Sequence, residues 1–143
     1  MATFNKFQQF VEDLALGVHN LNTGTINIYL SNATPSASLD AVKTDLAEIT
    51  NENGYTAPVD TQNTAAESTG TLTVTCTAVT ITASGGTVGP FQYVVAYNDT
   101  PTSPADPLIG WWDRGSALTL QAGDSFTWKP NNSATTGTLL TIA

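Results

Sequence analysis

The run TLTVTCTAVTITASGGTVGPFQYVVAYN, residues 71–98, alternates polar and apolar side chains over most of its length. Alternation with a period of two is typical of β-strands that bury one face. The apolar positions keep one parity up to Cys76 and take the other from Val79 onward, so a β-bulge near Ala78 is needed to keep both halves on one face. The first half therefore predicts a bulged strand over residues 71–83.

The same pattern continues toward the carboxyl end. Residues 91–98 form a second predicted strand, and SGG (84–86) together with Gly89-Pro90 predicts the turn before it. Short alternating runs then predict four more strands, which are LIGWWD, ALTLQ, DSFTW and GTLLTIA. Many short strands at this spacing favour a sandwich or jelly-roll-like architecture.

The amino-terminal part predicts two helices around one strand. Apolar side chains recur at three- and four-residue spacing from Thr3 to His19, which predicts an amphipathic helix. GTINIYL (24–30) alternates and predicts a strand, and SLDAVKTDLAEI (38–49) again has helical spacing. The first helical face comprises Phe4, Phe7, Val11, Leu14 and Val18, and the second comprises Leu39, Val42, Leu46 and Ile49.

These elements fit one mainly β domain of the α+β kind. We expect an antiparallel β-sandwich or jelly-roll-like fold that carries an N-terminal helix and a second short helix. The chain has 143 residues, of which 41% are hydrophobic, and this suits a single domain over 1–143. Within it we expect a helix-strand-helix part over 1–55, a surface loop over 56–70 and a β-rich part over 71–143.

Charge and composition exclude several classes of partner. Only 11% of the residues are charged, and the net charge is −8 because 4 Lys and Arg face 12 Asp and Glu. So few cations cannot neutralise a phosphate backbone, and we expect no nucleic-acid partner. The sequence has no apolar stretch of membrane-spanning length and no secretion signal at its N-terminus. We therefore expect a chain that is made in the cytoplasm and has no membrane partner.

Isolated reactive side chains do not combine into a catalytic or metal site. Cys76 lies in an apolar, threonine-rich run without basic neighbours, which predicts a buried, inert thiol. His19 at the end of the first predicted helix is expected to interact as an imidazolium with the helix terminus. Asp99, Asp106 and Asp113 carry the oxygen ligands that calcium prefers, but their spacing fits no calcium-binding loop. With no nucleophile elbow and no phosphate-binding glycine loop, we expect no enzyme, no metal and no cofactor.

The stretch IGWWDRG (109–115) holds most of the candidate interface and structural residues. Neighbouring side chains on a strand point to opposite faces, so Trp111 and Trp112 cannot form one flat platform. We expect one of them in the core and the other beneath a helix or another subunit. Asp113 and Arg114 would lie at the mouth of a hairpin whose turn is RGS, as an ion pair or a backbone clamp. The full candidate set is Phe4, Phe7, Trp111, Trp112, Asp113 and Arg114.

Three stretches are informative together: FNKFQQFVEDLALGVHNL, ASGGTVGPFQYVVAYNDT and PLIGWWDRGSALTLQAGDSFTW. They resemble a family of small structural proteins encoded by tailed bacteriophages and prophages. The resemblance spans nearly the whole chain and departs mainly over 56–70 and at the carboxyl terminus. It names no catalytic residues, so what it implies is assembly into a virion.

Among virion components, the resemblance favours a head decoration or cement protein that lies on the capsid surface and bridges neighbouring subunits. The partners it implies are the major capsid protein and further copies of the chain, as a homotrimer or another homo-oligomer. A tail, neck or fibre component that binds a receptor or glycan is the alternative, because an exposed tryptophan beside Asp113 could stack on a sugar. A sugar-binding module unrelated to virions is a third possibility.

Overall fold

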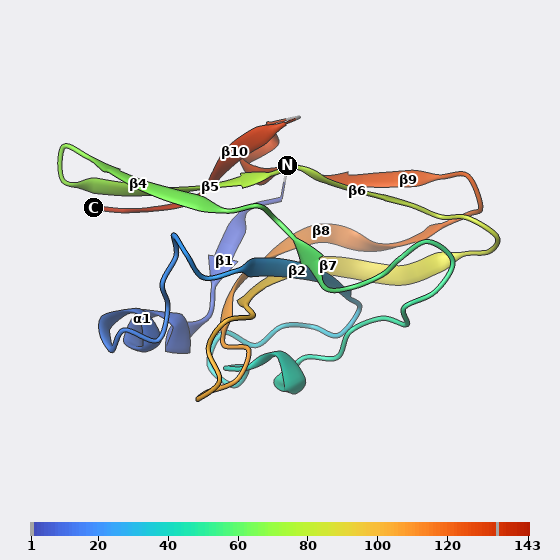
Figure 1. Cartoon of the computed structure of the whole chain (residues 1–143). Coiled ribbons are helices and arrows are strands. Elements are labelled where there is room, and N and C mark those ends of the chain that lie inside the picture. Colours follow the sequence, from blue (N-terminus) through green and yellow to red (C-terminus); the bar gives the residue numbers. More distant parts are fainter. Residues whose placement is uncertain (1, 134) are drawn as a thin grey trace.

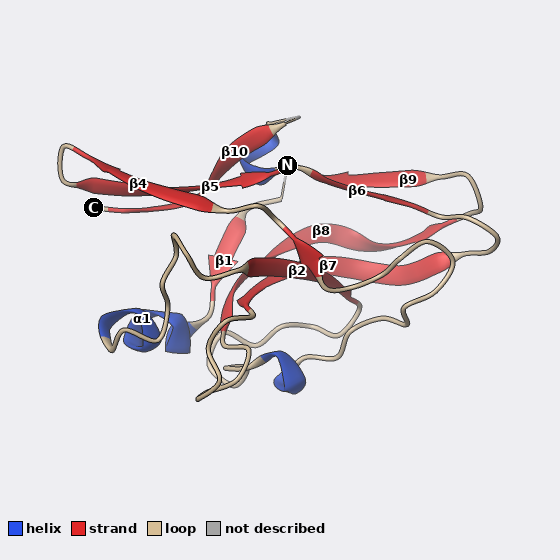
Figure 2. Ribbon diagram, in the orientation of Figure 1, coloured by secondary structure: helices blue, strands red, loops and turns tan. Residues whose placement is uncertain are grey.

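The computed structural model describes residues 2–133 and 135–143, which form a mainly β structure of packed antiparallel sheets with one α-helix (Figures 1 and 2). The predicted mainly β fold with an N-terminal helix is confirmed. In chain order the elements are β1 (Phe4–Lys6), α1 (Gln8–Ala15), β2 (Ile26–Ser31), η1 (Lys43–Asp45), β3 (Val59–Asp60), β4 (Thr64–Ser68), β5 (Thr71–Thr77), β6 (Val79–Thr82), β7 (Val88–Asn98), β8 (Leu108–Leu120), β9 (Ser125–Trp128), η2 (Pro130–Asn132) and β10 (Thr136–Ile142).

The larger layer is a five-stranded antiparallel sheet in the order β1-β8-β7-β2-β3. At its centre β7 and β8 form a long hairpin in which Val94 lies opposite Trp112. On one side β2 pairs with β7, with Ile28 opposite Ala96, and on the other side β1 pairs with β8, with Phe4 opposite Trp112. The first strands of the chain therefore flank a hairpin that comes much later in the sequence.

The second layer is a long two-stranded ribbon with one added strand. β5 pairs with β10, β6 pairs with β9, and β4 pairs with the outer side of β5. Only Ala78 separates β5 from β6, whereas a longer segment that contains η2 separates β9 from β10, so the ribbon has a large bulge there. A second register shift lies within β10, between Thr138 and Leu140. At the large bulge the Ala78 N–H donates to the Thr135 carbonyl. The irregularity predicted near Ala78 is confirmed, and extra residues on the opposite strand accompany it. Figure 1 shows this ribbon above the five-stranded sheet.

Apolar side chains fill both faces of the larger sheet. Alternate residues of β7 point to opposite faces, so Val94 and Ala96 join the cluster between the layers, while Val95 joins a second cluster on the far face. Residues 32–57 run across that far face and contribute Leu46 to the second cluster (Figure 1). This cover explains why all of β2 is buried although its sequence alternates.

The helix predicted from Thr3 to His19 is wrong at both ends. Residues 4–6 are strand β1, and α1 extends only over Gln8–Ala15. Val11, on the predicted apolar face, is 50% exposed, and Phe10 is buried instead. Residues 4–6 are extended because they pair with β8. The ring of Phe4 packs on Trp112, and the ring of Phe7, which follows β1, packs on Trp111.

Residues 38–49, the second predicted helix, contain only the single 3-10 turn η1. The Asp45 carboxylate accepts hydrogen bonds from the backbone N–H groups of Ala41 and Val42, at 2.9 and 3.0 Å, and this fixes a turn. Backbone groups of the segment also pair with β2 and with the loop before β8. Long-range pairing has therefore replaced the helical hydrogen bonds that the apolar spacing predicts.

Three predicted loops and turns are also wrong in part. The loop predicted over 56–70 contains β3 and β4, and the exposure of nearly all of β4 explains why its sequence carries no apolar alternation. No hairpin turn forms at RGS, because β8 continues through it and Gly115 adopts φ +89° within the strand. The Gly89-Pro90 pair lies inside β7 and not in the turn before it.

Candidate interaction site

Trp111 and Trp112 point to opposite faces of β8, as their adjacency predicts. Trp112 is 5% exposed, lies in the core between the layers, and packs against Phe4 and Trp128 with ring centroids 5.2 and 5.0 Å apart. Trp111 is half-buried and packs on Phe7 at 4.6 Å. The residue that precedes α1 therefore covers the second tryptophan, and both rings anchor the amino-terminal segment.

Asp113 and Arg114 make local contacts with the backbone. The Asp113 carboxylate accepts hydrogen bonds from the Gly115 N–H at 2.7 Å and from the Gln92 amide at 2.9 Å. The Arg114 guanidinium donates to the Ser116 carbonyl at 2.7 Å. Over the described part of the chain the two residues form no ion pair with each other. Of the two predicted roles, the backbone clamp is the one observed, and it holds the irregular residues of β8.

A small cavity, the aromatic pocket, lies beside the Trp112–Trp128 pair. Its volume is about 160 Å³. The exposed side chains of Arg114 and Lys129 lie at its open side. The apolar lining consists of Ala2, Val94, Trp112, Phe126 and Trp128. Lys129 and Asn132 follow β9 and belong to the lining, so the segment after β9 supplies one wall of the pocket.

A larger hollow, the edge groove, adjoins the aromatic pocket and shares Ala2, Trp112 and Asn132 with it. Its volume is about 610 Å³, and residues of β1 and β10 line it, among them Phe4 and Thr138. Both strands are edge strands of their sheets. The pocket and the groove thus form one concave surface at the edge of the two layers.

Trp128 has a buried polar atom without a partner. Its side chain is 4% exposed, and its indole Nε1 finds no hydrogen-bond acceptor among the described residues. A buried donor that is left unpaired costs about 1–3 kcal/mol.

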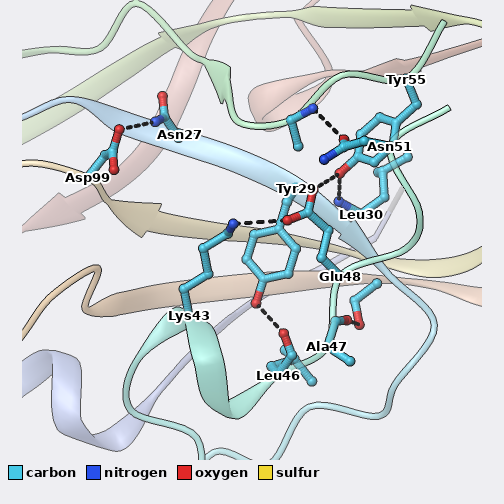
Figure 3. Close-up of polar contacts among 12 residues, drawn as sticks. Asn27, Tyr29, Leu30, Lys43, Leu46, Ala47, Glu48, Asn51, Tyr55 and Asp99 are labelled. Atoms are coloured by element: carbon cyan, nitrogen blue, oxygen red, sulfur yellow. Dashed lines mark hydrogen bonds and ion pairs between the residues drawn. The ribbon is translucent and has the colours of Figure 1, made fainter.

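A cluster of polar side chains holds residues 32–57 against the larger sheet (Figure 3). The Tyr55 hydroxyl accepts a hydrogen bond from the Leu30 N–H at 2.8 Å and donates to Glu48 at 3.0 Å. Glu48 also forms an ion pair with Lys43 at 2.9 Å. The Tyr29 hydroxyl donates to the Leu46 carbonyl at 3.1 Å. Burial raises the pKa of both tyrosines, so they remain neutral donors, and the cluster acts as a structural fastener.

His19 and Cys76 are both buried. Because α1 ends at Ala15, His19 does not lie at the helix terminus, and the predicted imidazolium role is wrong. Its ring packs on Phe10 at 5.0 Å, and burial lowers the pKa of His19 although the nearby Asp13 acts in the opposite direction. The buried thiol predicted for Cys76 is confirmed, and burial raises its pKa to about 11.

The three candidate calcium ligands do not meet. Asp106 and Asp99 lie within hydrogen-bond reach of each other, because both belong to the loop between β7 and β8. Asp113 lies on β8 opposite Tyr93, which is near the middle of β7 and away from that loop. Within residues 2–133 and 135–143, no group of three or more His, Cys, Asp and Glu side chains is arranged to hold a metal ion.

Large apolar side chains are exposed on and beside α1. Val11 and Leu16 are 50% and 71% exposed, and Leu39 is 80% exposed. The segment that carries Leu39 contacts the start of the helix, where the Gln8 N–H donates to the Ala37 carbonyl at 2.8 Å. These three side chains are called the α1 patch below. No α-helix in the described part of the chain is long and apolar enough to cross a membrane.

The chain has no match among protein-family models, curated proteins or solved structures. The interaction site is therefore defined by its own geometry. Phe4, Trp112 and Arg114 of the predicted candidates contribute to the pocket and groove, whereas Phe7 and Trp111 lie on the other face of the sheet.

Sequence reasoning missed Trp128 and Lys129 as members of the site. The alternation of DSFTW places Phe126 and Trp128 on one face of a strand, and this signal indicates that both rings are buried. It does not indicate that Trp128 meets Trp112, because that contact depends on how the two layers stack.

Proposed function

We propose that this chain is a structural protein of a tailed-phage virion that decorates the outside of the head and holds neighbouring major capsid subunits together. It is made in the host cytoplasm, acts as a homo-oligomer on the capsid surface and needs neither catalysis nor a cofactor. The resemblance of three stretches to small phage structural proteins supports this class. Its few charges and net charge of −8 suit protein partners and not nucleic acid.

The α1 patch is the observation that carries the proposal. Burial of apolar surface is the main favourable term in protein association. Val11, Leu16 and Leu39 offer such surface on and beside one helix. We assign this patch to contact with the major capsid protein.

A cement protein also needs a second contact surface, because it bridges subunits. The edge groove provides one, and strand β1 connects it to α1. Modest contacts at two surfaces gain strength when many copies bind one shell.

The glycan-binding alternative has less support. A sugar platform needs an exposed aromatic ring with polar groups around it. Trp112 and Trp128 are only 5% and 4% exposed, and Trp111 packs on Phe7.

Copy number in the virion tests the proposal. Quantitative mass spectrometry on purified virions of the encoding phage, normalised to the major capsid protein, should give a copy number of the same order as that protein. A few copies per particle would instead indicate a tail or neck component, and absence from the particle would overturn the virion role.

Substitution of the α1 patch tests the assigned surface. Val11→Ser, Leu16→Ser and Leu39→Ser together should abolish binding to capsids that lack the protein, as measured by co-sedimentation. The unfolding temperature should stay close to that of the unchanged protein, because these side chains are exposed. Ala66→Ser, an exposed apolar-to-polar change on β4, is the control and should bind normally. Binding of the triple variant would contradict the assignment.

A further inference from the structure

The aromatic pocket has the size of a site for one apolar group. An engineered apolar cavity of about 150 Å³ binds benzene. The pocket, at about 160 Å³, is lined by Val94, Trp112, Phe126 and Trp128. Its walls therefore suit a phenyl or branched aliphatic side chain.

The charged groups of the pocket suit an anion. The remaining polar side chains of its lining, Thr127 and Asn132, are uncharged. Arg114 and Lys129 are two of the four Lys and Arg residues in the chain, and both line this one pocket. None of the described residues that line it is acidic, and neither cation forms an ion pair within the described chain. The charge in the pocket is thus opposite to that of the chain as a whole.

The edge groove suits an extended polypeptide. It adjoins the pocket through Trp112 and Asn132, and the edge strands β1 and β10 border it. Edge strands present unpaired backbone donors and acceptors, which is how many proteins bind an extended segment. A free small molecule would use the pocket and leave the groove unused.

We propose that this surface binds an extended segment of a partner protein, with an apolar side chain in the aromatic pocket and a neighbouring carboxylate against Arg114 and Lys129. The segment lies along the edge groove between β1 and β10. The inference goes beyond the decoration role, because it concerns binding by the isolated chain and holds for any protein that supplies the segment. Failure of the virion experiment would leave it intact.

Titration of the intact chain with N-acetyl-phenylalanine tests the pocket. The readout is the indole N–H signals of the three tryptophans in proton–nitrogen correlation spectra. Saturable binding that moves the Trp128 signal most is expected, and the uncharged N-acetyl-phenylalanine amide should bind about tenfold more weakly. No saturable shift, or equal affinity for acid and amide, would overturn the assignment.

Two variants locate the binding determinants. Arg114→Gln combined with Lys129→Gln should remove the preference for the acid over the amide, whereas Lys6→Gln, a cation on β1 outside the pocket lining, should preserve it. Trp128→Phe keeps an aromatic ring but makes one wall of the pocket smaller, and it should weaken binding while the unfolding midpoint shows that the fold is kept. An effect of Lys6→Gln equal to that of the double variant would indicate general attraction by charge. It would contradict the assignment of the carboxylate contact to Arg114 and Lys129.

A peptide tests the groove. The probe acetyl-Thr-Phe-Asp-Thr-amide places a phenyl ring beside a carboxylate within an extended chain. It should bind at least several-fold more tightly than N-acetyl-phenylalanine, and methylation of the peptide's backbone nitrogens should reduce this gain by removing donors to the edge strands. A peptide that binds no more tightly than the single amino acid would overturn the extended-segment assignment in favour of a free apolar carboxylate.

Discussion

Asp106 and Asp99 place two carboxylates within hydrogen-bond reach of each other in the loop between β7 and β8. Burial is the largest cause that raises the pKa of Asp106, followed by the hydrogen bond and the charge of Asp99, while Lys43 acts in the opposite direction. A raised native pKa means that the folded chain binds more protons than the unfolded chain. Asp106 therefore contributes stability below the ordinary aspartate pKa of about 4, and this contribution is lost as the pH rises through the raised value of Asp106.

Asp106→Asn should accordingly stabilise the protein at pH 7 but not at pH 3. The amide can donate a hydrogen bond to Asp99 without adding charge, and asparagine tolerates the left-handed backbone of this position, φ +51°. Urea unfolding at the two pH values measures the effect. Glu12→Gln on the exposed side of α1 serves as the charge-matched control. A midpoint at pH 7 that is lower than in the unchanged protein would show that the pair is not repulsive.

Local sequence patterns predicted which side chains are buried, and which face of a strand they occupy, better than they predicted which residues those side chains contact. The buried thiol of Cys76 and the opposite faces of Trp111 and Trp112 follow from local pattern alone. The partners of Asp106 and Trp128 do not, because sequence-distant strands and loops bring them together. Spacing along the chain could group Asp99, Asp106 and Asp113, yet the strand geometry of β7 and β8 separates the third from the other two.

At the scale of elements, β1 depends on one glycine of β8. A Cβ on Gly110 would overlap the Phe4 ring and the Asn5 carbonyl oxygen. Gly110→Ala should therefore displace β1 and lower the free energy of unfolding by about 1–3 kcal/mol, as overpacking does. Urea unfolding followed by tryptophan fluorescence measures the loss, because Phe4 packs on Trp112.

The control for this change is Ser116→Ala, an exposed position on the same strand. It should unfold at nearly the same urea concentration as the unchanged protein. If Gly110→Ala matched this control, the pairing of Phe4 with Trp112 would have to be abandoned.

Strands were easier to predict than helices in this chain. Alternation located β2, β6, β7 and β9 because the apolar positions of at least one face of each are buried or half-buried. The two helical patterns failed where backbone groups pair with distant strands, over 4–6 and 38–49. Helical spacing shows only where the apolar side chains lie along the chain. It does not show whether a distant strand will form hydrogen bonds with the same backbone groups.

At the scale of the whole molecule, net charge opposes self-association. Like charges on copies of a chain with net charge −8 repel each other, and salt screens this repulsion over about 10 Å at 0.1 M. We expect a homo-oligomer, with a trimer as the first candidate, whose population grows as salt rises. Sedimentation velocity at low and high sodium chloride concentration measures it.

Leu16→Ser should leave this equilibrium nearly unchanged at every salt concentration, because the α1 patch is assigned to the major capsid protein and not to contact between copies of the chain. A chain that stays monomeric at high salt and high concentration would contradict the oligomer. A strengthening of association at low salt would point to attraction between opposite charges instead.

The order of strands in the larger sheet also governs how the chain can fold as it leaves the ribosome. β1 and β2 emerge early, but their long partners β8 and β7 emerge only after residue 88 has been added. Ile26, Ile28 and Leu30 must therefore remain without their final neighbours while most of the polypeptide is synthesised. The β4–β5 hairpin can form without strands that come later in the sequence. The main sheet forms late, because its central strands β7 and β8 must be synthesised first. Nascent chains that stall before β8 would expose a row of aliphatic side chains and become substrates for chaperones or proteases.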